Sequence, residues 1–88
     1  MKKTFSILLY TDPGHGWGKV KRSVLTSLGL ADKISSYSYQ YNDNVYLEED
    51  CDLGLLLQRL HDDGVAVKFT IKNTNNLSRI RSYERYSC

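Results

Sequence analysis

The sequence predicts a single α+β domain, because its apolar residues repeat with the strand period in one segment and with the helical period in two others. Residues 65–72 alternate between apolar and polar side chains, as in a strand with one buried face. Residues 19–28 and 53–60 instead place apolar side chains along one helical stripe. The chain has 88 residues, 41% hydrophobic and 25% charged, which suits a folded protein with one core. We therefore expect one domain over residues 1–72, followed by a tail over residues 73–88.

The first third of the chain is predicted to form a strand, a loop and a helix. Residues 4–10 are rich in β-branched, aromatic and aliphatic side chains, which favours a strand. Residues 11–18 contain one proline and three glycines, a composition that predicts a loop. The helical stripe that follows spans about three turns, and Gly29 suits the end of that helix. Its apolar residues are Val20, Val24, Leu25 and Leu28.

A β-hairpin is predicted next. Residues 35–41 and 45–48 alternate in polarity, and Asn42-Asp43-Asn44 between them can adopt the positive φ angles of a tight turn.

The second helix is predicted to begin after the acidic residues 48–52. Acidic side chains stabilise the positive end of a helix, and either aspartate of this run can cap its exposed N–H groups. A stripe of leucines follows, and the helix should end at Gly64 before the strand over residues 65–72. Leu53, Leu56, Leu57 and Leu60 make up this stripe.

The predicted order β-α-β-β-α-β matches the ferredoxin-like split βαβ arrangement. In that arrangement an antiparallel sheet carries two helices on one face. The main alternative is a β-hairpin variant with a different strand order.

The cysteine content indicates a reducing compartment, and the hydropathy indicates neither a signal peptide nor a membrane span. Cys51 and Cys88 are far apart in sequence and imply no disulfide framework. The apolar run 7–10 is far shorter than the hydrophobic part of a signal peptide or a membrane span. We expect a cytoplasmic protein.

The net charge of +2 belongs to the tail. Cations and anions cancel over residues 1–72, whereas residues 73–88 hold three arginines against one glutamate. Such a tail suits an anionic partner or an acidic patch of its own domain. Its arginines and tyrosines are also common in interface hot spots, so the tail is a candidate contact segment. The alternative is a strand or strap that closes the sheet edge.

A glycine-rich turn that leads into a helix can bind phosphate through backbone N–H groups. Residues 14–19 fit neither the P-loop spacing nor the dinucleotide-binding spacing. The predicted helix start is nevertheless basic, which favours an anionic ligand; the alternative is a simple turn with Trp17 packed at the core edge. The candidate ligand-binding residues, taken with the tail, are Gly14, His15, Gly16, Trp17, Lys19, Lys21, Arg22, Arg79, Arg81 and Tyr83.

No metal or cofactor is expected. His15 and His61 do not have zinc-ligand spacing. The acidic run 48–52 does not have the spacing of an EF-hand loop and is better explained as a capped helix start.

The seven tyrosines admit two explanations. Exposed aromatic rings on a sheet can stack nucleic-acid bases, and the open face would offer Tyr10 and Tyr46 beside Lys68 and Lys72. The favoured alternative is that the tyrosines pack within the protein and that the tail covers this face.

Four strings of the sequence together resemble a family of small uncharacterised proteins encoded by tailed bacteriophages and prophages. The strings are DPGHGW, YSYQ, YLEEDCD and SRIRSY. This resemblance implies a phage origin, expression in the cytoplasm of a bacterial host, and no catalytic residues to carry over. We expect a non-enzymatic binding module for a host factor or an anionic ligand, either nucleic acid or a nucleotide. The alternative is a protein-interaction or homo-oligomerising domain, and a small hydrolase that uses His15 is the least favoured.

Overall fold

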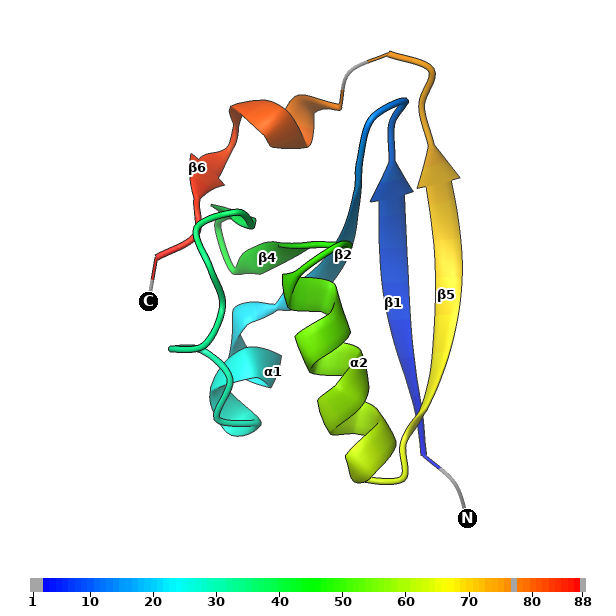
Figure 1. Ribbon diagram of the computed structural model, residues 1–88, viewed down its shortest axis with the longest axis vertical. Helices are drawn as coiled ribbons and strands as arrows, with labels where there is room; N and C mark the ends of the chain where they lie inside the picture. Colours follow the sequence, from blue (N-terminus) through cyan, green and yellow to red (C-terminus); the bar gives the residue numbers. More distant parts are fainter. Residues whose placement is uncertain (1–2, 77, 88) are drawn as a thin grey trace.

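The computed structural model describes residues 3–76 and 78–87, which form an α+β fold around one mixed sheet of six strands (Figure 1). The strands lie in the order β5-β1-β2-β4-β3-β6. The elements are β1 (Thr4–Thr11), β2 (Gly16–Lys21), α1 (Arg22–Ser27), β3 (Tyr39–Tyr41), β4 (Asn44–Glu48), α2 (Asp52–Asp62), β5 (Ala66–Asn73), the 3₁₀ helix η1 (Arg79–Ser82) and β6 (Glu84–Arg85).

The α+β class is confirmed, but the ferredoxin-like topology is not. Only β1 and β5 run parallel, whereas all other neighbouring strands are antiparallel. An additional strand, β2, lies between β1 and β4 and changes the strand order. The tail adds a sixth strand, because β6 pairs with β3 and closes that edge of the hairpin.

The prediction of a loop over residues 11–18 and of a helix from residue 19 is wrong in its boundaries. Residues 16–21 form strand β2, and α1 is correspondingly short. Gly18 is needed here because α2 packs closely against the strand: a Cβ atom at this position would lie 2.7 Å from Cδ1 of Leu53. Glycine therefore allows a close approach of helix and sheet at this position and does not break the strand.

The bounds of the hairpin, α2 and β5 agree with the predictions to within a few residues. The expected buried face of β5 is wrong over most of the strand, since only Val67 is half-buried and Phe69 and Ile71 are exposed. Asn42 adopts a φ of 54°, as the predicted tight turn requires, and Gly64 ends α2 with a φ of 72°.

The predicted aspartate cap of α2 is wrong, since no side chain caps this helix. Asp52 instead accepts hydrogen bonds from the backbone N–H and the hydroxyl of Ser35 and from the hydroxyl of Ser38. It thus holds the segment before β3 against α2.

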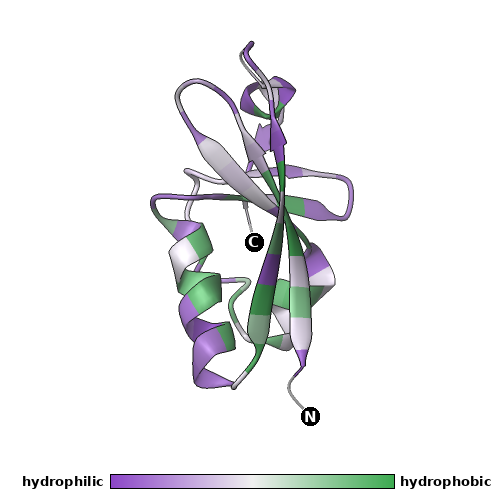
Figure 2. Ribbon diagram, turned by 90° about the vertical axis from the view of Figure 1, so that its right-hand side faces the viewer, coloured by the Kyte–Doolittle hydropathy of each residue, from purple (hydrophilic) through white to green (hydrophobic). Residues whose placement is uncertain are grey.

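Each face of the sheet has its own apolar cluster. The helical face packs against both helices, through residues such as Leu25 of α1 and Leu56 of α2. The opposite face, which we call the tail face, buries Trp17 and Tyr46 of the sheet against Ile80 of η1. Figure 2 shows that hydrophobic and hydrophilic residues alternate along β5 at the edge of the sheet.

Replacing Gly18 with alanine should destabilise the fold, because the added methyl group would collide with Leu53 and lie 3.2 Å from Cγ2 of Ile7. We expect a loss of about 1–3 kcal/mol in the free energy of unfolding, measured by urea denaturation. The control is Gly54→Ala in α2, where the new Cβ would meet nothing within 4 Å beyond the adjacent backbone of its own helix among the described residues. That substitution should stabilise the protein by up to about 1 kcal/mol through helix propensity. Equal effects of the two substitutions would contradict the close packing at Gly18.

Candidate functional site

The carboxylate of Asp12 joins the β1–β2 turn to the C-terminal segment. Its Oδ1 accepts hydrogen bonds from the backbone N–H groups of Gly14 (3.0 Å) and His15 (2.9 Å) and from Nη2 of Arg81 (3.0 Å). Its Oδ2 accepts from the N–H of Ser78 (2.9 Å) and from Nε of Arg81 (2.7 Å). The side chain has no exposed surface. The Arg81 guanidinium and these backbone donors hold the pKa of Asp12 far below its ordinary value of 3.8.

Arg81 also lies over the indole ring of Trp17, with its guanidinium carbon 5.5 Å from the ring centroid. Trp17 is only 2% exposed. Two residues that the sequence predicted as ligand contacts are therefore held in contacts within the protein. They form one wall of a cavity, but little of the indole is available to a partner.

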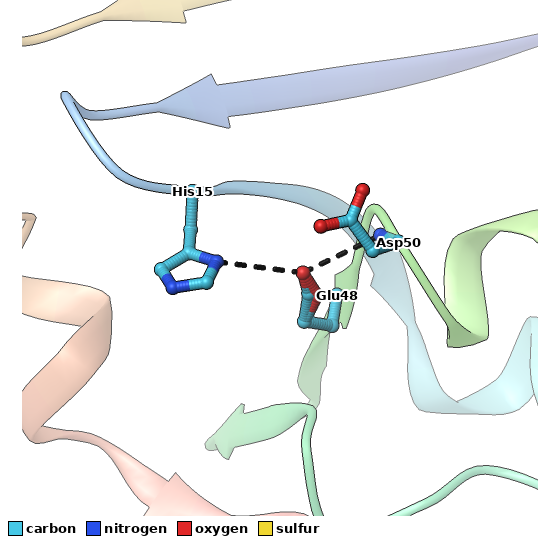
Figure 3. Close-up of side chains that lie close together, drawn as sticks. All are labelled: His15, Glu48 and Asp50. Carbon is cyan, nitrogen blue, oxygen red and sulfur yellow. Dashed lines mark hydrogen bonds and ion pairs between the residues drawn. The ribbon is translucent and has the colours of Figure 1, made fainter.

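This first cavity has a volume of about 450 Å³ and opens beside the β1–β2 turn. We call it the His15–Glu48 cavity. Nδ1 of His15 lies 3.6 Å from Oε1 of Glu48, which also accepts a hydrogen bond from the N–H of Asp50 (3.3 Å; Figure 3). The cavity is lined by His15, Trp17, Tyr37, Tyr39, Glu48, Asp50, Cys51, Arg81 and Arg85. Cys51 is an exposed free thiol, while the predicted thiol of Cys88 lies outside the described residues.

Two buried polar atoms in the wall of this cavity have no hydrogen-bond partner among the described residues. They are Nε1 of Trp17, a donor, and Oε2 of Glu48, an acceptor. Glu48 is only 9% exposed. A buried carboxylate oxygen without a donor is costly, so this position is a candidate for ligand binding.

A second cavity, of about 500 Å³, lies between β5, β1 and the C-terminal segment on the tail face. We call it the Lys72–Arg79 cavity. Lys72 and Arg79 are its only charged lining residues among those described. Tyr10, Tyr46 and Tyr83 supply aromatic walls, and the remaining lining residues are Thr11, Asn73, Thr74, Ser78 and Ile80.

The tyrosine walls of this cavity pack on one another. The rings of Tyr10 and Tyr46 meet edge to face with centroids 6.1 Å apart, and those of Tyr46 and Tyr83 are 5.2 Å apart. Burial, together with the neighbouring Tyr83 and Tyr10, raises the pKa of Tyr46 to about 12. A hydrogen bond with Tyr83 is among the causes of this shift, so the Tyr46 hydroxyl belongs to the packed tyrosine cluster.

The predicted ligand-binding residues are divided among several places. His15, Trp17 and Arg81 line the first cavity, and Arg79 and Tyr83 line the second. Gly14 and Gly16 shape the β1–β2 turn, where a Cβ on Gly16 would collide with Glu49.

The basic residues at the predicted helix start do not join either cavity. Lys19 lies within β2, where its register partners are Leu8 and Tyr46. Arg22 donates to Oε1 of Gln40 (2.7 Å) and lies over the ring of Tyr86. Lys21 lies next to Arg22, at the exposed end of β2.

Glu48, Asp50 and Lys72 line the cavities but were not among the predicted site residues. The alternation of residues 45–48 predicts that Glu48 lies on the same face of the sheet as Tyr46. This pattern could have identified Glu48 as a site residue. The bonds of Asp12 to Gly14 and His15 are local to the turn, but its bonds to Ser78 and Arg81 gave no local signal, because these partners are more than 60 residues away.

A comparison of the chain with protein-family models, with curated proteins and with solved structures finds no match. Among the described residues, none of the helices has both the length and the hydropathy that a transmembrane helix requires.

The depressed pKa of Asp12 makes part of the stability depend on pH. The folded protein binds this proton less readily than the unfolded chain, so the stabilisation is present above the ordinary pKa of 3.8 and is lost as the pH falls below it. Urea denaturation between about pH 6 and pH 3 should therefore show a steeper loss of unfolding free energy in the wild type than in Asp12→Asn. Asp32→Asn, at an exposed position, should keep the wild-type slope. A wild-type slope in Asp12→Asn would contradict the role of this carboxylate.

Proposed function

We propose that the protein is a non-enzymatic binding module for an anionic ligand, a nucleotide or single-stranded nucleic acid, and that the Lys72–Arg79 cavity is the binding site. The observation that carries this proposal is the charge of the cavity. Both of its charged lining residues are cations, and neither pairs with a carboxylate among the described residues.

The two cations come from separate elements and approach the cavity from different sides. Lys72 lies on β5 opposite Tyr10 of β1, so both side chains belong to the tail face. Arg79 is the first residue of η1 and is exposed. A lysine and an arginine without acidic neighbours attract phosphate groups. The planar guanidinium group of Arg79 can bind a phosphate through two hydrogen bonds.

The tyrosines suit the base and sugar of such a ligand. Aromatic rings stack nucleobases without regard to sequence, and hydroxyl groups donate to phosphate oxygens. Tyr46 is 6% exposed, so the half-buried Tyr10 and Tyr83 present the accessible aromatic surface of this cavity. The resemblance to small phage proteins is consistent with such a binder in the cytoplasm of a bacterial host and with no enzymatic role.

The double substitution Lys72→Ala with Arg79→Ala should weaken binding of a fluorescein-labelled oligothymidylate at least tenfold. It should also lower the slope of log K against log salt by about 1.4, since each lost phosphate contact on a single strand contributes about 0.7. Fluorescence anisotropy at several salt concentrations measures both quantities, and competition with ATP tells whether a mononucleotide is sufficient. Lys21→Ala with Lys33→Ala removes the same charge from exposed positions outside the cavity and is the control. Equal affinity and slope in the two double variants would refute the assignment of the site.

The β5 edge favours a second candidate function, the binding of another protein. Within residues 3–76 and 78–87, strand β5 pairs on one side only, with β1, and its Phe69 and Ile71 are 40% and 63% exposed. Self-pairing in the antiparallel register centred on Thr70 is disfavoured, because it would place Lys68 opposite Lys72 of the second copy. In other antiparallel registers the lysines of the two copies still share the tail face of the joined sheet. An acidic extended segment of a host protein would complement this edge better.

Light scattering on a size-exclusion column should therefore give the mass of a monomer, 10.1 kDa, at low ionic strength. The repulsion between the β5 lysines is least screened under these conditions. A stable dimer at low salt that Ile71→Lys converts to a monomer would contradict this reasoning and would favour a homo-oligomeric function.

A further inference from the structure

We propose that His15, Glu48 and Asp50 bind a divalent transition-metal cation such as Zn²⁺ in the His15–Glu48 cavity. This site is separate from the proposed anion site, since the two cavities share no lining residue. One ligand atom from each of the three side chains lies within 4.8 Å of the others, and Figure 3 shows the side chains close together.

The donor set fits this class of ion. An imidazole nitrogen together with two carboxylates suits borderline cations such as Zn²⁺ and Fe²⁺, whereas Mg²⁺ and Ca²⁺ prefer oxygen donors alone. Ligands around 2.1 Å from a common ion lie roughly 3–4 Å from one another. Nδ1 of His15 and Oε1 of Glu48 are already 3.6 Å apart. His15 and Asp50 are exposed, so small side-chain rotations can complete the approach.

Glu48 provides the independent observation that points to a cation. The Glu48 side chain is 12% exposed, yet its Oε2 atom is itself buried and accepts no hydrogen bond from the described residues. Burying an ionised carboxylate with an unsatisfied oxygen is costly unless a positive charge lies close by. A metal ion beside Glu48 would supply that charge.

The two arginines that line the cavity do not supply this positive charge to Glu48. Arg81 lines the same cavity, but its guanidinium is engaged by Asp12. Arg85 lies over the ring of Tyr39 and donates to the carbonyl of Ser36. Glu48 and Asp50 together therefore leave an excess of negative charge at the point where His15 approaches.

Backbone hydrogen bonds also fix the segments that carry the three proposed ligands, and a metal site requires such support. The backbone N–H of His15 donates to the buried carboxylate of Asp12 (2.9 Å), which fixes the turn. The backbone N–H of Glu48 donates to Oγ of Ser38 (3.0 Å), and the N–H of Asp50 donates to Glu48 itself. Three protein ligands leave at least one coordination position for water. The indole N–H of Trp17, which has no partner within the described part of the chain, lines the same cavity and could donate to such a water.

The site can be tested with Co²⁺, a paramagnetic ion with ligand preferences similar to those of Zn²⁺. Trp17 is the single tryptophan, and its ring centroid is 6.0 Å from that of His15. Co²⁺ bound here should broaden or shift the one indole N–H signal in the NMR spectrum at one equivalent. Zn²⁺ added afterwards should restore a diamagnetic signal by competition.

His15→Ala and Glu48→Gln should each raise the dissociation constant of Co²⁺ at least tenfold. The matched controls are His61→Ala, at the other histidine, and Glu49→Gln, at the exposed acid next to Glu48; both should bind as the wild type does. His15 is exposed, so its substitution should leave the fold intact even if Glu48→Gln does not fold.

Three results would overturn the proposal. The first is a wild-type indole signal that Co²⁺ leaves unchanged. The second is equal binding by His15→Ala and His61→Ala. The third is a Co²⁺–thiolate charge-transfer absorption that persists in His15→Ala and in Glu48→Gln, which would place the ion on a cysteine and not on the three proposed ligands. None of them would bear on the oligothymidylate measurement, because His15 and Glu48 do not line the Lys72–Arg79 cavity.

Discussion

The hydrogen bonds of the Asp12 carboxylate fix the β1–β2 turn and the C-terminal segment, which supply part of the lining of both cavities. Both oxygens of this one side chain are satisfied, by two backbone N–H groups of the β1–β2 turn and by Ser78 and Arg81 of the C-terminal segment. A buried charge persists only when it is paired and fully hydrogen-bonded, and Asp12 meets both conditions. The carboxylate thus ties two parts of the chain that are remote in sequence.

Both cavities are lined in part by the segments that Asp12 joins. Fixing the turn places His15 beside Glu48, and fixing Arg81 places its guanidinium over Trp17. Because η1 contains Arg81, its other residues are positioned at the same time: Ile80 packs into the tail face, and Arg79 reaches the second cavity. A small domain with limited core in this way forms two polar cavities around one ion pair whose carboxylate is buried.

The sequence predicted best those elements whose signal is local. The alternation of β5 and the leucine stripe of α2 depend on neighbours a few residues apart, and both elements were found within a few residues of their bounds. Strand β2 was missed because its glycines are typical of loops. Gly18 is required because Leu53 of α2 packs directly against it, and this contact joins residues that are far apart in the sequence.

The sites were harder to predict for the same reason. The acidic run 48–52 was interpreted as one helix start, but its members have different partners. Glu48 ends β4 beside His15, whereas Asp52 binds Ser35 and Ser38. The arginines of the tail were expected to be available to a partner, but Arg81 is neutralised within the domain. Such pairings arise only when the sheet brings distant segments together.

The most direct test of the central role of Asp12 is amide hydrogen exchange, measured residue by residue by NMR near neutral pH. If the carboxylate holds both segments, the N–H groups of His15 and Ser78 are protected in the wild type. In Asp12→Ala both should lose protection together, while the β1–β5 ladder keeps its slow exchange. Unchanged protection of Ser78 in Asp12→Ala would contradict this account, since it would mean that apolar packing alone holds the C-terminal segment in place.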